Sequence, residues 1–552
     1  MSSAIARTTR GGGRRASVAV AVAAAVFVLW QLLAVAGPAS AHAVLVSSDP
    51  QDGSRLTSAP ARVTFTFDEA VQLPDDGTAA VSDTGTDAAG GDATLAASGR
   101  EVVVPLAKGL PDGAYTVSYR VVSADGHVVT GAIRFGVNTA PTAPPHIAAE
   151  PADPVQVVAN GAQGAVYLGL VLAFGTTFAT LALWPGTARR RGAHILRWLG
   201  WGLLLGGTMT RLLLAGPVAT ATGWAGVLGF DGFATTIQET GGIAGMIRAV
   251  LLLLLLPWTI RPTRGGPASV STAAIASIGI LATIAVDGHA VTGSDWWLAV
   301  PATMLHLAAM AVWVGGLVVL LLLGLRTLGG DDDDRTRMRR WSIVAFSSVC
   351  ALMLTGEYLA WRQIDPIPSI ADTAYGETLL VKLALVALAL AIAVVSHRLL
   401  VRRSSPTKAS GRSRVRIAVG VEAALTITVV LVTTLLVSLP PARTTYGPTT
   451  TLTAPAGRES ALITISPTHA GPQHITVTLQ SPSGAEADAA SVHGTLGSDT
   501  VAGITVRFAH DSAGSWSADV IAPVAGEWTI QLAIDLGSAG TYATSARYRV
   551  WQ

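Results

Sequence analysis

The chain has 552 residues, of which 50% are apolar and 13% charged, and its mean hydropathy is +0.50. This composition excludes an ordinary soluble globular protein and indicates a polytopic membrane protein bound to lipid. The charges of the 37 basic and 35 acidic residues nearly cancel. Because the sequence has no patch of basic and aromatic residues, we do not expect nucleic acid to be a partner.

The first 41 residues have the parts of a signal peptide. Basic residues between Arg7 and Arg15 precede an apolar run from Val18 to Ala36, and small residues at 39–41 suit a cleavage site. Cleavage there leaves His42 first, with an α-amine and a ring Nδ1 that can chelate one metal ion. A chain that is cut elsewhere, or left uncut, cannot form this chelate.

Residues 42–138 alternate apolar and polar side chains in short segments between turn residues, as in Val63, Phe65 and Phe67. About seven such strands suit an all-β sandwich of two sheets. Asp125 and His127 lie two residues apart, so on a strand their side chains share a face. The alternative is a β-turn in which Asp125 caps the bend and His127 is only exposed.

This domain resembles the CopC family of periplasmic copper-binding proteins. The resemblance rests on the sequence that starts at His42, on residues 110–117 and on the Ser-Ala-Asp-Gly-His run at 123–127. It implies a Cu(II) site formed by the amine and ring of His42, the ring of His127 and the carboxylate of Asp125. Nitrogen and oxygen donors suit Cu(II). Residues 42–138 contain no methionine, so we expect no Met-rich Cu(I) site there.

A Pro- and Ala-rich linker is expected at 139–159, and residues 160–440 then contain about eight apolar segments. Each is about long enough to cross ~30 Å of hydrocarbon. The segments lie near 162–184, 194–216, 243–260, 268–287, 299–324, 341–361, 376–401 and 414–439. Arginine clusters follow the odd-numbered segments, whereas the remaining loops contain only Arg362. The positive-inside rule therefore predicts a plasma (inner) membrane protein with both mature termini on the exported side.

Histidine and methionine residues fall towards the outer side of this predicted bundle. His289 follows the fourth segment, and His306 lies about two turns into the fifth, with Met310 on the same helix face and Met304 on another. Further ionisable residues also lie in outer halves, which favours an outward-facing polar cavity: Arg211, Arg248, Glu357 and Lys382. The alternatives are arginines that snorkel, a Glu357–Lys382 pair, methionines that only pack and a surface His289.

This block is similar to the CopD family of copper-linked membrane proteins. The matching residues are Gly288-His289-Ala290, His306, Trp313, Gly315-Gly316, Tyr375-Gly376, Leu380-Val381-Lys382 and Glu422 before Pro440-Pro441. The resemblance implies copper handling at the membrane, with His289 and His306 as candidate ligands and Met310 and Met304 as further ones. A thioether beside an imidazole suits Cu(I), which requires a reduction step. A reductase or a copper chaperone is therefore a candidate partner.

A Thr-rich linker at 441–454 precedes a second predicted exported β-sandwich at 455–552. This domain resembles the extra β-domain of some CopC–CopD fusions. Its four histidines have no short metal-ligand spacing, so we expect a structural or docking role. They are His469, His474, His493 and His510.

The whole pattern predicts a mixed fold: a polytopic α-helical bundle of about eight spans flanked by two exported all-β sandwiches. The leading interpretation is a copper-binding membrane protein, not an enzyme, that captures Cu(II) outside the membrane and mediates uptake. Copper resistance by sequestration or export would use the same residues. The sequence also allows a haem-binding electron carrier with His289 and His306 as axial ligands, or a copper oxidase built on His42. Against the oxidase, Asp125 would occupy the coordination position that oxygen needs.

Overall fold

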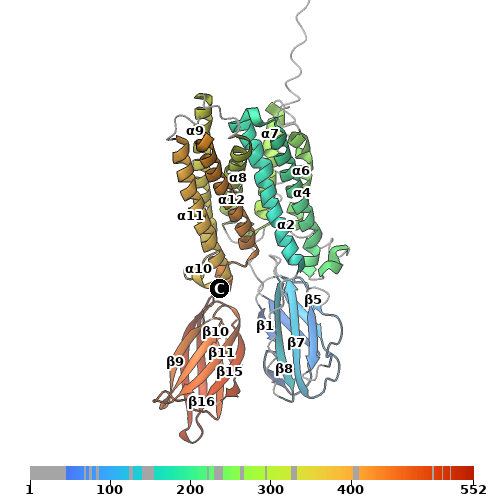
Figure 1. Cartoon of the computed structure of the whole chain (residues 1–552). Helices are drawn as coiled ribbons and strands as arrows, with labels where there is room; N and C mark the ends of the chain where they lie inside the picture. Colours follow the sequence, from blue (N-terminus) through green and yellow to red (C-terminus); the bar gives the residue numbers. More distant parts are fainter. Residues whose placement is uncertain are drawn as a thin grey trace, which may run out of the picture.

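The computed structural model describes residues 45–67, 70–73, 77–82, 86–122, 128–139, 154–220, 223–228, 236, 240–260, 267–291, 295–324, 332–401, 409–499, 501, 503–512, 514–522 and 524–551. Within these ranges the chain forms a helical bundle with two β-domains side by side at one of its ends (Figure 1). The front β-domain precedes the bundle in the chain and the second follows it.

The front domain is a sandwich of two four-stranded sheets. One sheet has the order β1 (Leu45–Asp49), β3 (Arg62–Phe67), β6 (Glu101–Pro105) and β5 (Thr94–Leu95). The other has the order β2 (Ser54–Leu56), β8 (Val128–Val137), β7 (Gly113–Val122) and β4 (Thr78–Ser82). The alternation predicted for β3 is confirmed, because Val63, Phe65 and Phe67 are all buried. Tyr119 of β7 packs against Phe65 with ring centroids 4.8 Å apart, so aromatic side chains join the two sheets.

The long helices of the bundle correspond to the predicted apolar segments. They are α2 (Pro154–Leu170), continued by η1 (Val171–Gly175), α3 (Thr176–Phe178) and η2 (Ala179–Leu183); α4 (Arg191–Thr220); α6 (Thr240–Ile260); α7 (Pro267–Val286); α8 (Trp296–Val319), continued by η6 (Leu320–Gly324); α9 (Asp332–Trp361); α11 (Ala374–Val401); and α12 (Ala409–Ser438). Short helices connect or flank them: η3 (Pro185–Thr187), η4 (Gly223–Leu228), η5 (His289–Val291), α10 (Ser369–Asp372) and α13 (Ala442–Thr445).

Six helical segments among the described residues are long and apolar enough to cross a membrane. They are Pro154–Leu183, Thr240–Thr259, Trp296–Gly324, Thr336–Trp361, Ala374–Val395 and Arg416–Ser438. Helices α4 and α7 lie among them in the same bundle (Figure 1). Helix α2 begins before residue 160, inside the predicted linker, because Pro154 suits the first helical position, where no backbone N–H is needed.

Glycine residues let two segments of the bundle approach closely at its centre. A Cβ added to Gly315 of α8 would lie only 2.6 Å from the Cα of Gly175 in η1. Small residues at such contacts bring helix backbones together, which is how helices associate in the absence of a hydrophobic driving force between them. Helix α8 is thereby held in the middle of the bundle, and 72% of its most apolar stretch is buried.

The second β-domain is also a two-sheet sandwich. One sheet has the order β14 (Ala509–Ser512), β15 (Ser515–Ala522), β11 (Gly471–Gln480), β10 (Glu459–Ser466) and β9 (Thr450–Ala456). The other has the order β13 (Ile504–Arg507), β12 (Ser491–Ser498), β16 (Gly526–Asp535) and β17 (Thr541–Val550), after the short η7 (Gly537–Ala539). Strand β9 begins inside the predicted Thr-rich linker, because its threonines pair with β10.

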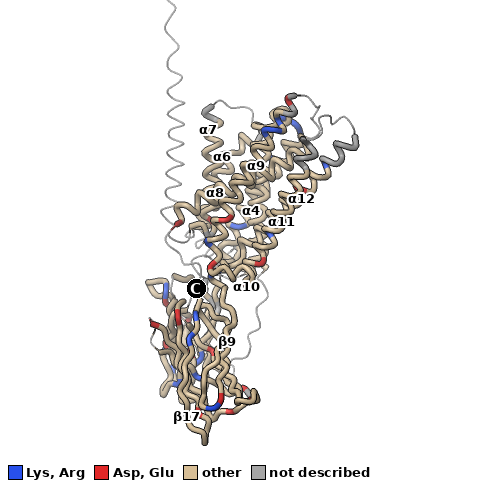
Figure 2. Tube along the Cα trace, turned by 90° about the vertical axis from the view of Figure 1, so that its left-hand side faces the viewer, with Lys and Arg blue, Asp and Glu red and all other residues tan. Residues whose placement is uncertain are grey.

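The two β-domains contact each other through β1 and β15. Arg134 Nη2 of β8 lies 3.4 Å from Asp519 Oδ2 of β15, and Ile521 packs against the core of the front domain. Asp519 Oδ1 also lies 2.8 Å from His474 Nδ1. Figure 2 shows Lys and Arg residues at the end of the bundle away from the β-domains, with acidic residues at its tip, and charges of both signs in the half nearer to the β-domains.

Candidate metal centre

The three residues of the predicted Cu(II) site lie outside the described residues: His42, Asp125 and His127. The nearest described residues along the chain are Leu45, Val122 and Val128. Strand β1 begins at Leu45, and Val122 at the end of β7 pairs with Val128 at the start of β8. The predicted ligands therefore precede β1 in one sheet and join two paired strands of the other. The Cu(II) site stays a prediction.

His306 on α8 faces α9. Its Nδ1 lies 2.9 Å from Thr355 Oγ1, and Thr355 is buried. A Cβ added to Gly356 would lie 3.2 Å from His306 Cε1, so this glycine leaves room for the ring. The ammonium group of Lys382 on α11 interacts electrostatically with the ring. A half-buried imidazole is thus held between α8 and α9.

The methionines near His306 lie in different packing clusters. Met310, one turn further along α8, is buried among aliphatic residues of α2, α7 and α12. Met304 packs in another cluster with Ala290 and Val291 of η5 and with Tyr358 of α9. His289 is the first residue of η5. The next two residues, Ala290 and Val291, pack in the same cluster as Met304 of α8, which lies two residues before His306. Ligation by any of these four side chains stays a prediction.

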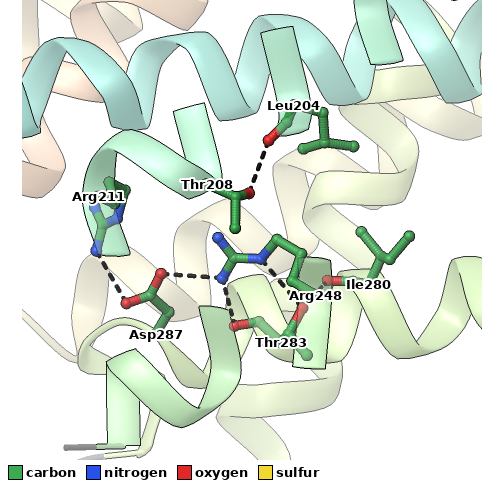
Figure 3. A network of polar contacts seen from close by, with 7 residues as sticks. All are labelled: Leu204, Thr208, Arg211, Arg248, Ile280, Thr283 and Asp287. Carbon is green, nitrogen blue, oxygen red and sulfur yellow. Dashed lines mark hydrogen bonds and ion pairs between the residues drawn. The ribbon is translucent and has the colours of Figure 1, made fainter. Parts of the chain in front are cut away.

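An ionic network joins α4, α6 and α7 close to His289 in the chain (Figure 3). Arg211 Nη2 donates to Asp287 Oδ1 at 2.9 Å, and Arg248 Nη2 donates to Asp287 Oδ2 at 3.0 Å. Arg248 also donates to Oγ1 and O of Thr283, at 3.2 and 2.9 Å. Both arginines thus have a carboxylate partner inside the bundle, which contradicts the alternative that they only snorkel to headgroups. Each carboxylate oxygen of Asp287 holds one arginine, because a charge buried in a bundle needs a partner.

The sequence around Asp287 repeats a segment of the front domain. Asp287-Gly288-His289-Ala290-Val291-Thr292-Gly293 matches residues 125–131 of the front domain at six of seven positions. The segment that carries two of the three predicted Cu(II) ligands, Asp125 and His127, thus recurs at the end of α7. In the copy at α7 both oxygens of the aspartate are taken up by arginines, so His289 is the candidate ligand that remains in it.

A second ionic cluster ties α8 to α9 at the end of the bundle near the β-domains. Arg362 donates from Nε to Asp295 Oδ2 at 3.0 Å and from Nη2 to Oδ1 at 3.0 Å, and Tyr358 Oη donates to Oδ2 at 2.6 Å. Burial acts to raise the pKa of the Asp295 carboxyl. The hydrogen bonds from Tyr358 and Arg362 and the charge of Arg362 outweigh it and hold that pKa below its ordinary value. The sequence suggested no partner for Arg362.

Among the described residues, Glu357 and Glu422 of the bundle take part in none of the ion pairs. Glu357 is exposed, and no ion pair with Lys382 occurs within the described part of the chain. Glu422 is buried on α12, with 5% of its surface exposed. Among the residues with described placement, no three His, Cys, Asp or Glu side chains gather into a group that could hold a metal ion.

Comparisons with known proteins match the front domain and the later helices of the bundle. Residues 45–138 match the family described as CopC domain, and residues 335–436 match the family described as Copper resistance protein D, CopD. The copper transport protein CutJ of Bacillus subtilis (strain 168) is 29% identical over 400 residues, which cover 70% of this chain and 73% of CutJ. Protein YobA of Escherichia coli (strain K12) is 34% identical over 102 residues, 18% of this chain and 79% of YobA.

Solved structures resemble the front domain. The crystal structure of CopC from Methylosinus trichosporium OB3b is 27% identical and covers 19% of this chain and all of that one, with a TM-score of 0.17. PcoC, a methionine-rich copper resistance protein from Escherichia coli, is 29% identical and covers 18% of this chain and 99% of that one, with a TM-score of 0.16.

The fold and the family matches together define a multi-pass membrane protein of copper transport or copper resistance. Proteins of this class bind or move the ion and are not enzymes, as the sequence predicted. The chain belongs to the CopC–CopD fusions, with a CopC domain before the bundle, a CopD domain within it and a further β-domain after it.

Proposed function

We propose that this protein captures Cu(II) outside the membrane with residues 42–138 and mediates copper uptake through its helical domain. The α-amine and ring of His42, the ring of His127 and the carboxylate of Asp125 would hold the ion. This donor set supports Cu(II), which prefers nitrogen and oxygen ligands and has the highest affinity among the divalent first-row metals. The CopC and CopD matches, both of copper families, are the observation that carries this proposal.

The proposed orientation puts both β-domains on the extracytoplasmic face of the plasma membrane. In Figure 1 the two domains lie at the same end of the bundle, and Figure 2 shows Lys and Arg residues gathered at the opposite end. Cytoplasmic loops carry an excess of Lys and Arg, which supports a cytoplasmic location for that end. An even number of crossings is needed for this arrangement. Eight crossings follow if α4 and α7 span the membrane together with the six more apolar segments.

Within the bundle, His306 and His289 would receive the copper, with Met310 and Met304 as weaker candidates. All four belong to α8 or to the adjoining η5. Imidazole and thioether ligands favour Cu(I), so a partner reductase would supply the electron before transfer. Uptake is favoured over export because the Cu(II)-binding domain and the polar half of the bundle lie on the same side of the molecule (Figure 2).

The test is the copper content of cells grown at limiting external copper, with and without this chain. Uptake predicts more cell copper with the intact chain and a loss of that gain in His306→Ala. The Cu(II) signal of the front domain should stay unchanged in the same variant. Lower cell copper with the intact chain would show export or sequestration instead, and an unchanged copper content in both would contradict the uptake proposal.

A further inference from the structure

The hydroxyl of Thr355 makes two short polar contacts. Its Oγ1 lies 2.6 Å from the carbonyl oxygen of Ala351, four residues earlier on α9, and 2.9 Å from Nδ1 of His306. A carbonyl oxygen can only accept, so the single hydroxyl hydrogen of Thr355 is donated to Ala351. The hydroxyl oxygen is then left as an acceptor towards the histidine.

The contact at Nδ1 therefore requires a hydrogen on that nitrogen. In a neutral imidazole one ring nitrogen donates and the other carries a lone pair, so an Nδ1–H ring has its lone pair on Nε2. No hydrogen bond to His306 Nε2 occurs among the described residues of the bundle. The Nδ1–Cε1 edge of the ring lies against Thr355 and Gly356, and Nε2 is the nitrogen that does not take part in this contact.

We infer that Thr355 is a positioning residue that fixes His306 as the Nδ1–H tautomer and so presents Nε2 as the copper ligand. Metal-bound histidines usually donate their other ring N–H to an oxygen acceptor, which sets the tautomer and the orientation of the ring. Thr355 is buried and lies on α9, so the oxygen acceptor comes from a different helix than His306, which lies on α8. Because His306 is a copper ligand only under the function proposed above, the role of Thr355 rests on that function.

The glycine next to Thr355 completes the arrangement. A side chain at residue 356 would meet Cε1 at 3.2 Å, a distance at which the ring or the helix must move. Thr355 therefore supplies the acceptor and Gly356 the space, both from one turn of α9. A neutral ring binds copper through the lone pair of Nε2, so copper binding at this nitrogen would release no proton.

The direct test is the tautomer of His306, read by ¹⁵N nuclear magnetic resonance of the full chain in lipid nanodiscs. The chain contains 11 histidines, and signals that disappear in His306→Ala identify this one. We expect a protonated Nδ1 and an unprotonated Nε2 in the parent and in Thr355→Ser. In Thr355→Val, which keeps the size and lacks the oxygen, the Nδ1–H form should lose its predominance. A bare Nδ1 in the parent, or an unchanged tautomer in Thr355→Val, would overturn the inference.

A second readout is anaerobic Cu(I) binding in competition with a chromogenic chelator, with His127→Ala in every sample to remove the front site. Thr355→Val should weaken Cu(I) binding about fivefold to tenfold, the effect of one neutral hydrogen bond, and Thr355→Ser should restore it. If His306→Ala leaves Cu(I) affinity unchanged, the proposed membrane site is wrong, and the tautomer measurement then decides only whether Thr355 sets the tautomer of His306. If His306→Ala weakens binding and Thr355→Val does not, the inference alone is wrong.

Discussion

Replacement of Asp287 by asparagine should destabilise the bundle strongly. The side chain of Asp287 is 7% exposed and holds Arg248, at 1% exposed, and Arg211, at 31%. Loss of one partner from a buried ion pair costs about 3–5 kcal/mol, because the remaining charge stays buried. The asparagine oxygen can still accept from one arginine, so we expect a loss of about 3 kcal/mol, at the lower end of that range.

Arg211→Gln is the matched control for this variant. It removes the other side of the same ion pair at a position that is partly exposed, where such pairs contribute roughly 1 kcal/mol or less. Both variants would be unfolded in detergent micelles by heat and by denaturing detergent, with helix content as the signal. Asp287→Asn should lose stability about 2 kcal/mol more than Arg211→Gln.

The same experiment separates a structural aspartate from a copper ligand. Since each oxygen of Asp287 is taken up by an arginine, Asp287→Asn should leave the copper stoichiometry of the folded chain unchanged. A variant as stable as Arg211→Gln would refute the ionic network as the main role of Asp287. A variant that stays stable but loses copper would show that the α7 copy of the motif uses its carboxylate as the front copy is predicted to do.

Two further outcomes follow from the packing and from the second ionic cluster. Gly315→Ala should cost about 1–3 kcal/mol because its Cβ would overlap Gly175, whereas Gly202→Ala, with open space around it, should be neutral or stabilising in the same thermal unfolding assay. The pKa of Asp295 lies below its ordinary value of 3.8, so the stability from its pair with Arg362 is complete above that pH and is lost as the pH falls through the lowered pKa. Asp295→Asn should remove this part of the acid dependence of the unfolding temperature, and an unchanged acid dependence would contradict it.

The periodic features of the sequence predicted most of the fold. The apolar segment expected at 268–287 is the helix Pro267–Val286, and the alternation in β3 gives a buried face. These predictions depend on neighbours close in sequence, for which helix and strand periods are reliable guides. The starts of α2 and β9 fall inside the predicted linkers, because Pro154 and the threonines of β9 can end a linker or begin an element.

The contacts of the candidate site could be predicted only in part. The placement of His306 and Met310 on one helix follows from the sequence, but the contact of His306 with Thr355 joins residues 49 apart in the chain. The partners of Asp287 lie 76 and 39 residues away, and Arg134 meets Asp519 across 385 residues. Such contacts depend on how helices and domains pack, which local patterns do not encode. A comparison of the chain with itself would have singled out Asp287 through the repeated segment.

The central claim is that export creates a Cu(II) chelate at the first residue of the mature protein. The most direct measurement is the electron paramagnetic resonance spectrum of Cu(II) bound to the full chain purified from an exporting host, with its first residue determined by mass spectrometry. We predict that the chain begins at His42 and binds one tight Cu(II) with a nitrogen-rich spectrum, which a single alanine placed before His42 weakens markedly. A different first residue, or equal affinity with the added alanine, would contradict the account.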